Sequence, residues 1–249
     1  MTPLEYKKFQ RHAGRDTYQR RLERATEWVH DLFDRFDAPV LNYSGGKDSL
    51  VLLHLVTQRC GYDDVAVYHF DNGLLNVPGV GAFVRESVDR HGGNLYYRSS
   101  EKAQSEDMLL EEGHGYNGFW GHHARLWNRE DWDCRLLGIR AAESRDRRDR
   151  FDSDGQRPPI RYDERFTAAA PIHHLSTQDV WAYIVANDLE YHSIYDDQGE
   201  LYDGIDARDN RLVTIYDHEF DSRGSLEVSQ WLFPDATNEL KEIEQRERE

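Results

Sequence analysis

The hydrophobic positions of this chain follow two periods that alternate along the sequence. Between residues 17 and 36, apolar side chains recur every three or four positions, which predicts an amphipathic helix. Residues 39–43 form a short apolar run that suits a strand covered on both faces. Residues 65–70 and 94–98 predict two more strands, with a helix over 80–91 between them. This order of strands and helices indicates a parallel sheet with right-handed crossovers.

The second half of the chain continues the same alternation. Residues 135–140 predict a strand that ends in Gly-Ile-Arg, followed by a helix start, and residues 160–162 and 166–169 predict a hairpin. A further helix begins near residue 177 with Ser176 or Thr177 as its N-cap and Asp179 in its first turn. We expect an α/β fold with a Rossmann-like, mostly parallel sheet and helices on both faces. The expected organisation is an N-terminal helical segment (1–37), a central domain (38–200) and an acidic, mostly helical extension (201–249).

Composition narrows the class of protein. The 249 residues contain no apolar run long enough to cross a membrane and no signal-peptide pattern, so we expect no membrane partner. Two cysteines, Cys60 and Cys134, form no disulfide framework, which favours a reducing, cytoplasmic location. Two thiols also exclude an iron–sulfur cluster held by four cysteines of one chain, and each cysteine is expected to be a packed, structural residue.

The net charge of −16 argues against broad electrostatic binding to nucleic acid or anionic lipid, although a local basic groove stays compatible with it. An Asp-rich, Lys-poor composition fits either a salty cytoplasm or merely a GC-rich coding sequence. Lysine occurs at only five positions, and Lys47 is one of them.

Lys47 lies in a glycine turn between the first strand and the following helix. The turn and the helix start comprise Ser44, Gly45, Gly46, Lys47, Asp48 and Ser49. The glycines permit a tight turn and a close ligand, and the N–H groups of the helix start together with the Lys47 charge make an anion site. The Walker A spacing is absent. The alternative is an ordinary strand-to-helix turn that contains Gly-Gly-Lys.

Two further positions follow strand ends, where ligands bind in parallel sheets. Asp71 ends the second strand and could hold a ribose or, with Asp48, a Mg²⁺ ion; it could also be a simple turn residue before Asn-Gly. Arg140 ends the fourth strand in Gly-Ile-Arg, and arginine suits bidentate contacts to phosphate. Glu143 could fix Arg140 or hold a helix end. On its chemistry alone this segment could equally be a salt-bridged surface turn.

The segment 113–123 is rich in glycine, aromatic residues and histidine. It could be a mobile lid over a pocket or a packed surface loop. His122 and His123 make a poor metal pair because adjacent residues do not share a helix face.

Ser-Gly-Gly-Lys-Asp-Ser after a strand resembles the PP-loop of the ATP pyrophosphatase (adenine nucleotide alpha hydrolase-like) superfamily. Gly-Ile-Arg-x-x-Glu-Ser resembles a signature of the phosphoadenylyl-sulfate (PAPS) reductase family. Residues 171–184 and 189–195 resemble that family's P-I-x-x-W-T-x-x-D-V-W-x-Y-I and L-P-Y-x-x-L-Y segments, with Leu175 in place of Trp and Glu190 in place of Pro. Residues 71–78 resemble its D-T-G-x-x-x-P-E region, with Asn72 in place of Thr.

The resemblance implies that the loop 44–49 binds the pyrophosphate part of ATP or the phosphates of an adenylyl sulfate (PAPS or APS). Arg140, Glu143 and Ser144 carry over to the family signature, and we take Arg145 as its following arginine. An enzyme of this kind would transfer or cleave at the α-phosphate and release pyrophosphate. Lys47 would stabilise the leaving group, Asp48 or Asp71 would hold Mg²⁺, and Arg140 and Arg145 would orient the reactants.

The family's C-terminal Glu-Cys-Gly-x-His motif, which carries the thiol nucleophile of the reductases, has no match, since no cysteine follows Cys134. We therefore expect an adenylyl transferase acting with a protein partner or as a homo-oligomer, in sulfur or nucleic-acid modification. The alternatives are a PAPS reductase that uses a partner's thiol, and a non-catalytic nucleotide-binding module.

Overall fold

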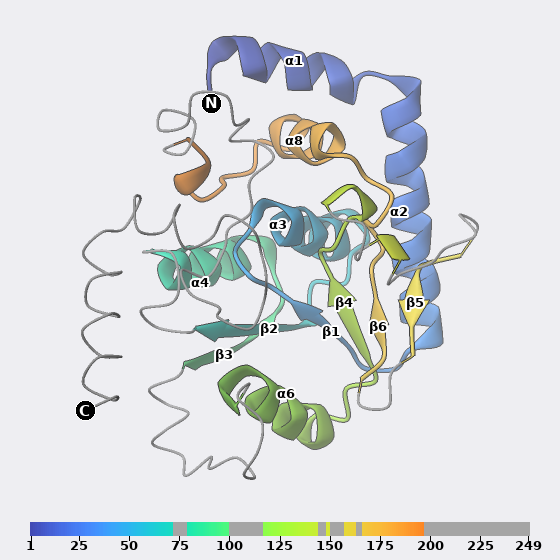
Figure 1. The fold of residues 1–249 in the computed structure, drawn as a ribbon, viewed down its shortest axis with the longest axis vertical. Helices are drawn as coiled ribbons and strands as arrows, with labels where there is room; N and C mark the ends of the chain where they lie inside the picture. The colour runs from blue at the N-terminus through green and yellow to red at the C-terminus, as the bar shows by residue number, and fades with distance from the viewer. Residues whose placement is uncertain (72–78, 100–116, 144–147, 150–156, 163–165, 197–249) are drawn as a thin grey trace.

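A six-stranded sheet forms the centre of the molecule (Figure 1). The computed structural model describes residues 1–71, 79–99, 117–143, 148–149, 157–162 and 166–196. The strands are β1 (Pro39–Asn42), β2 (Ala66–Asp71), β3 (Asn94–Ser99), β4 (Cys134–Leu137), β5 (Ile160–Arg161) and β6 (Ala168–Ala169), in the spatial order β3-β2-β1-β4-β6-β5. All neighbours are parallel except β5 and β6. The expected mostly parallel α/β fold and the 160–169 hairpin are confirmed.

The strand order reverses direction at β1. The chain runs outward from β1 through β2 to β3, and then returns to place β4 on the other side of β1. In register, Val40 of β1 lies opposite Ala66 of β2 and Arg135 of β4. A crevice outside the carboxyl ends of two strands that diverge in this way is where open α/β sheets bind ligands. The fold therefore points to the residues that follow β1 and β4.

Helices cover both faces of the sheet. Above it in Figure 1 lie α3 (Lys47–His54), α4 (Val80–His91) and α8 (Thr177–Ala186), with α1 (Pro3–Ala13) and α2 (Asp16–Arg35) outside them, and α6 (Asn117–Arg129) lies below. The alternation of side chains along β2 accounts for the two layers. Val67 joins the large core under α3 and α4, while Tyr68 and Phe70 join a smaller core with Leu126 of α6.

Several elements begin, end or continue differently from what the sequence predicted. The predicted helix over 17–36 is α2, but α1 before it begins at Pro3, with a capping box between Thr2 and Glu5 that the hydrophobic period alone did not reveal. The helix after the glycine turn continues beyond α3 as a π-helical turn, Leu55–Arg59. The strand expected to end in Gly-Ile-Arg ends earlier, at Leu137, and the helix start expected after it is a short 3-10 turn, Ala141–Glu143.

Other predictions fall partly or wholly outside the described residues. Ser144, Arg145 and the extension beyond residue 200 belong to this group. Residues 113–116 do too, whereas residues 117–123 form the first part of α6, so the surface loop does not apply to them. Within the part of the chain that the structure describes, no helix combines the length and the apolar character needed to cross a bilayer.

Candidate nucleotide-binding site

The turn between β1 and α3 is shaped by its glycines and braced by two serines. Gly45 has a φ of +79°, a conformation that favours glycine, and a Cβ there would come within 3.1 Å of Val84 on α4. The Ser44 hydroxyl accepts from the backbone N–H of Gly46 and lies 3.0 Å from the Ser49 hydroxyl, which donates to the Gly46 carbonyl at 2.9 Å. The turn is thus held in one shape by its own side chains.

Lys47, Asp48 and Arg140 form a buried charge network at this turn. Lys47 and Arg140 are each only 1% exposed, and Asp48 is 8% exposed. One Asp48 carboxylate oxygen lies 3.1 Å from Lys47 Nζ, and the other accepts from Arg140 Nε at 2.5 Å. The structure therefore brings the candidate residues of two distant motifs into direct contact, and both cations are oriented by a single carboxylate.

Arg140 is held on two further sides. Its backbone N–H donates to Glu143 Oε2 at 3.2 Å, and its Nη2 lies 3.8 Å from Glu143 Oε1, so Glu143 fixes Arg140. Its Nη1 donates to the hydroxyl of Thr177, the first residue of α8, at 3.2 Å. The three partners fix both the position and the plane of the guanidinium.

Gly138 presses the turn after β4 against the start of α3. A Cβ at this position would lie 2.8 Å from both the N and the Cα of Ser49. Real Cβ atoms do not approach backbone this closely, so only glycine allows the two turns to meet. The carboxyl ends of β1 and β4 form one site for this reason.

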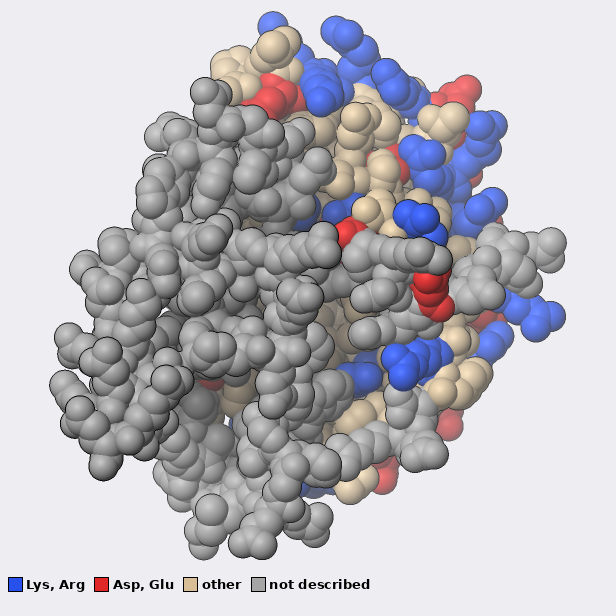
Figure 2. Space-filling view, in the orientation of Figure 1, with Lys and Arg blue, Asp and Glu red and all other residues tan. Residues whose placement is uncertain are grey.

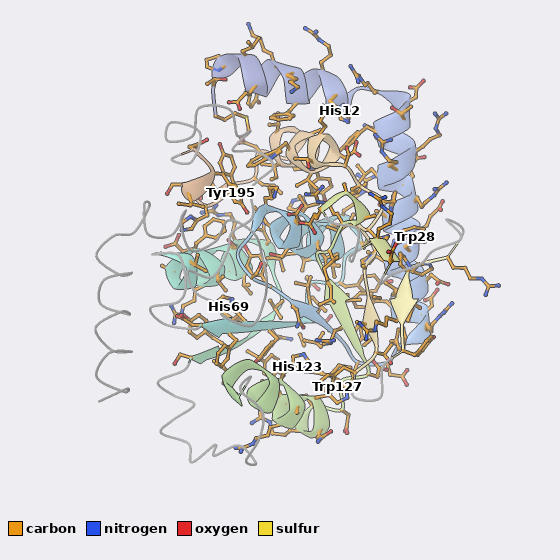
Figure 3. All side chains as sticks on the ribbon, viewed as in Figure 1. His12, Trp28, His69, His123, Trp127 and Tyr195 are labelled. Atoms are coloured by element: carbon orange, nitrogen blue, oxygen red, sulfur yellow. The ribbon has the colours of Figure 1, made fainter. Side chains whose placement is uncertain are left out.

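Tyr195 completes the site from a segment 148 residues away (Figure 3). Its hydroxyl accepts from the backbone N–H of Lys47 at 3.0 Å, and Lys47 Nζ lies 5.3 Å from the centre of its ring. Sequence analysis missed Tyr195 and Thr177 as site residues, although both lie in the segments 171–184 and 189–195 that resemble the family. The available signal for Tyr195 was its match to the final tyrosine of the L-P-Y-x-x-L-Y segment, whereas Thr177 stands at a variable position of its segment.

Asp71 lies at the carboxyl end of β2 and is engaged by its neighbour strand. It accepts a hydrogen bond from Tyr97 of β3, and burial together with this bond raises the pKa of Tyr97 to about 12. The Arg85 guanidinium stacks 3.7 Å from the centre of the Tyr97 ring. Next to it, His69 lies 2.8 Å from the Tyr43 carbonyl through Nδ1, and burial lowers the pKa of His69 (Figure 3).

Asp48 and Asp71 are the carboxylates expected to hold magnesium. Mg²⁺ keeps several waters and takes one or two carboxylates plus substrate oxygens. In the structure both Asp48 oxygens contact the cations of Lys47 and Arg140, and Asp71 accepts a hydrogen bond from Tyr97. Among the residues that the structure describes, no group of three or more His, Cys, Asp or Glu could hold a metal ion by itself.

Comparison with known proteins identifies the family. The model of the phosphoadenosine phosphosulfate reductase domain matches residues 38–230. This chain belongs to that family. The match begins just before β1 and includes the glycine turn, Arg140 and Tyr195.

Relatives and structural neighbours of this PAPS reductase-family chain carry names of adenylyl-transferring and reducing enzymes. Sulfate adenylyltransferase subunit 2 of Mycolicibacterium vanbaalenii is 29% identical over 212 residues, which cover 76% of this chain and 67% of the relative. The Shewanella woodyi protein of the same name is 24% identical over 209 residues, covering 72% and 67%.

Two solved structures share the fold. Candida glabrata FMN adenylyltransferase, in complex with FMN and an ATP analogue, superposes with a TM-score of 0.53 at 16% identity, covering 77% of this chain and 68% of that one. A phosphate complex of Candida auris PAPS reductase gives a TM-score of 0.52 at 18% identity, covering 73% and 86%.

Neither cysteine of this PAPS reductase-family chain lies at the site. Cys134 is the first residue of β4, about 13 Å along the strand from Gly138, and burial raises its pKa to about 12. Cys60 follows the π-helical turn at the far end of the α3 helix, and burial raises its pKa to about 11. Both thiols stay protonated at neutral pH and are poor nucleophiles, which agrees with the structural role expected for them.

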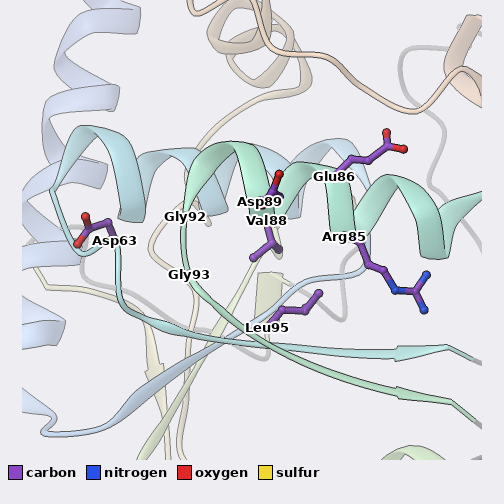
Figure 4. Close-up of a pocket in the computed structure, with 8 residues that line it drawn as sticks. All are labelled: Asp63, Arg85, Glu86, Val88, Asp89, Gly92, Gly93 and Leu95. Carbon is purple, nitrogen blue, oxygen red and sulfur yellow. The ribbon is translucent and has the colours of Figure 1, made fainter.

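A groove of about 650 Å³ between α4 and β3 is a different feature (Figure 4). Its lining comes from the C-terminal half of α4, from Gly92 and Gly93, and from Asp63 before β2, so it lies at the amino ends of the strands. Asp63, Glu86 and Asp89 outnumber its single cation, Arg85. This charge makes the groove unsuited to phosphate.

Proposed function

We propose that this chain binds ATP at the glycine turn and transfers its adenylyl group to an acceptor, releasing pyrophosphate. The observation that carries the proposal is the buried Lys47–Asp48–Arg140 network at the carboxyl ends of β1 and β4. Two fully buried cations beside a helix N-terminus form a preorganised environment for charge on phosphate oxygens.

The proposed step is a displacement at the α-phosphorus. An acceptor oxygen forms a bond to the α-phosphorus while the bond from that phosphorus to the pyrophosphate oxygen breaks, and negative charge grows on the leaving pyrophosphate. Lys47 and the N–H groups of the α3 start would stabilise that charge, and Arg140, held by Glu143 and Thr177, would orient the α-phosphate or the acceptor. Magnesium bound with the nucleotide, at Asp48 or Asp71, would neutralise further charge.

Names of relatives support adenylyl transfer over reduction. Sulfate adenylyltransferase subunit 2 and FMN adenylyltransferase are both named for adenylyl transfer. A thiol-dependent reduction would require a thiolate at the site, and both cysteines lie away from it with raised pKa values. The second candidate is PAPS reduction with a thiol from a partner chain. The match to the PAPS reductase domain is the observation that supports this candidate.

The acceptor, the partner and the location belong to the same proposal. We place the reaction in sulfur or nucleic-acid modification in the cytoplasm, with a second protein or a second copy of this chain completing the complex. A nucleotide-binding module without chemistry is the remaining alternative.

The test measures pyrophosphate release from ATP and Mg²⁺, with and without cell extract, alongside sulfite release from PAPS with thioredoxin. Lys47→Ala should remove most ATP and PAPS binding while the fold persists, and Lys8→Ala, which changes an exposed lysine on α1, is the matched control. Pyrophosphate that requires Lys47 supports the proposal. Sulfite release would establish the second candidate, and nucleotide binding without either product would leave the binding module. Unchanged nucleotide affinity in Lys47→Ala would overturn the site itself.

A further inference from the structure

Positive charge is concentrated at the start of the chain. Residues 1–25, which comprise α1 and the first half of α2, contain seven lysines and arginines and three acidic residues, a net charge of +4 in a chain whose total is −16, whereas residues 26–37 contain one arginine and four acidic residues. These residues precede the matched family domain, which begins at residue 38. The positive charge therefore belongs to an addition outside the nucleotide-binding domain, and the proposed nucleotide chemistry does not account for it.

The basic side chains of this addition face outward. The basic face, as we define it, comprises Lys7, Lys8, Arg11, Arg15, Arg20 and Arg24, all of them exposed. Along α1 its members recur at helical spacing, opposite the buried Phe9, His12 and Ala13. Figure 2 shows Lys and Arg atoms gathered along the upper edge over α1 and down the upper right edge over α2.

The face is rigidly attached to the domain. Phe9 stacks on Trp181 of α8 with ring centres 6.1 Å apart. His12 Nε2 and Arg21 Nη2 each lie 2.8 Å from the same carboxylate oxygen of Asp179, which is completely buried. A partner that contacts the basic face thus contacts a preformed surface, which lowers the ordering cost of binding.

We propose that this basic face binds the phosphate backbone of a nucleic acid. Six exposed cations on two helices joined at a corner match a repeating polyanion, and backbone phosphates are its commonest partner. Exposed Asp16, Glu23 and Glu27 lie beside the arginines of α2, so the densest positive charge belongs to α1 and Arg15. Insertion of α1 into a membrane does not fit, because its apolar face already packs on α8.

The proposal makes a quantitative claim about salt. Neutralising about six phosphates predicts a slope of log affinity against log salt of about −5 on duplex DNA and about −4 on single strands. Removing two of the cations should reduce the slope by about 2 on duplex DNA. The face is separate from the Lys47 site, so these changes should leave ATP binding and pyrophosphate release unaltered.

The experiment is fluorescence anisotropy with labelled 20-nucleotide single-stranded RNA and 20-base-pair DNA across a salt series. Lys8→Gln combined with Arg11→Gln should weaken binding at least tenfold at low salt. Arg125→Gln combined with Arg129→Gln, which removes the same charge from exposed positions on α6, is the control and should change binding less than twofold. The relative affinity of the two probes shows which nucleic acid the face prefers.

Three results would overturn the proposal. An equal loss of nucleic-acid affinity in both double variants would mean that nucleic acid does not bind specifically at the basic face. Absence of binding to both probes at low salt would exclude a nucleic-acid surface. The third result is a salt-sensitive dimer, detected by sedimentation, in a protein that does not bind nucleic acid. If Lys8→Gln with Arg11→Gln abolished that dimer, the partner of the basic face would be an acidic surface of a second copy.

Discussion

Individual side chains at this site are specified by contacts that admit few substitutes. Arg140 shows this most clearly, because its guanidinium and backbone together contact Asp48, Glu143 and Thr177 while almost no surface reaches solvent. Removing one member of a buried ion pair leaves the other without compensation for its lost hydration, which costs more than the pair itself contributes.

Arg140→Gln should therefore lower the free energy of unfolding by about 3–5 kcal/mol. Combining it with Asp48→Asn should cost less than the sum of the two single losses, because the bond between Arg140 and Asp48 can be lost only once. Chemical denaturation of the two single variants and the double variant measures the coupling. Arg35→Gln, which breaks the exposed Arg35–Asp31 pair, is the control and should cost less than about 1 kcal/mol. Strict additivity of the two site substitutions would contradict the network.

Gly138→Ala tests the close approach of the two turns. The added methyl would lie 2.8 Å from Ser49 backbone atoms, so the first turn of α3 must shift. We expect ATP affinity to fall at least tenfold and the melting temperature to drop. Gly14→Ala is the control, because its Cβ would meet nothing nearer than 3.7 Å and its φ is −80°. Wild-type affinity in Gly138→Ala would show that the approach does not shape the site.

At the scale of elements, α8 links the site to the N-terminal helices. Its N-cap Ser176 and its third residue Asp179 form a capping box, and the same Asp179 carboxylate accepts from Arg21 and lies against His12. Burial opposes ionisation of Asp179, but the bonds from Arg21, His12 and Ser176 outweigh it and lower its pKa. The Asp179 carboxylate thus caps the N-terminus of α8 and holds α1 and α2 against it.

Asp179→Ala should destabilise more than Ser176→Ala for this reason. Loss of the Ser176 cap alone should cost about 1 kcal/mol. Loss of Asp179 should cost about 3 kcal/mol and should also loosen α1 and α2, because Arg21 and His12 lose their shared partner. Hydrogen exchange in α1 is the decisive measurement. Faster exchange in Asp179→Ala but not in Ser176→Ala is expected, and equal exchange would contradict the anchoring role.

The elements themselves were largely predictable, whereas their contacts were not. The apolar run of β1, the periods of α2 and α4, and the Ser176 cap are local signals, and each predicted element is found. Thr177 contacts Arg140 across 37 residues of sequence, and Tyr195 contacts Lys47 across 148. The hydrophobic pattern of neighbouring residues cannot predict contacts between positions so far apart. The glycine turn and Gly-Ile-Arg were recognised as separate motifs, but only the strand order places Asp48 against Arg140.

At the scale of the whole molecule, folding keeps several histidines neutral. Burial is the main cause that lowers the pKa of His54, His69, His91, His123 and His174, to about 4 for His54 and about 3 for His123. The unfolded chain takes up these protons near pH 6.5. The stability that depends on neutral histidine is therefore complete above about pH 6.5 and declines as the pH falls below that value.

His123→Phe should reduce this acid sensitivity. His123 packs among Tyr68, Trp127 and Phe166, so an aromatic substitute suits its surroundings. A fully shifted histidine contributes about 2 kcal/mol to the fall in stability between pH 7.5 and pH 5. Urea unfolding at both pH values measures the difference, with His30→Gln at an exposed position as the control. An unchanged pH dependence in His123→Phe would contradict the assignment.

The position of β1 between β2 and β4 also sets an order for assembly. β1 pairs with β2 across 26 residues but with β4 across 95, so the first pairing closes a much shorter loop. The half built on β1, β2 and β3 can form early and already contains the glycine turn. Arg140 arrives only when β4 docks, and Tyr195 only when the segment after α8 does. We therefore expect the proposed nucleotide site to be completed in the last steps of folding, and ATP binding measured during refolding would time those steps.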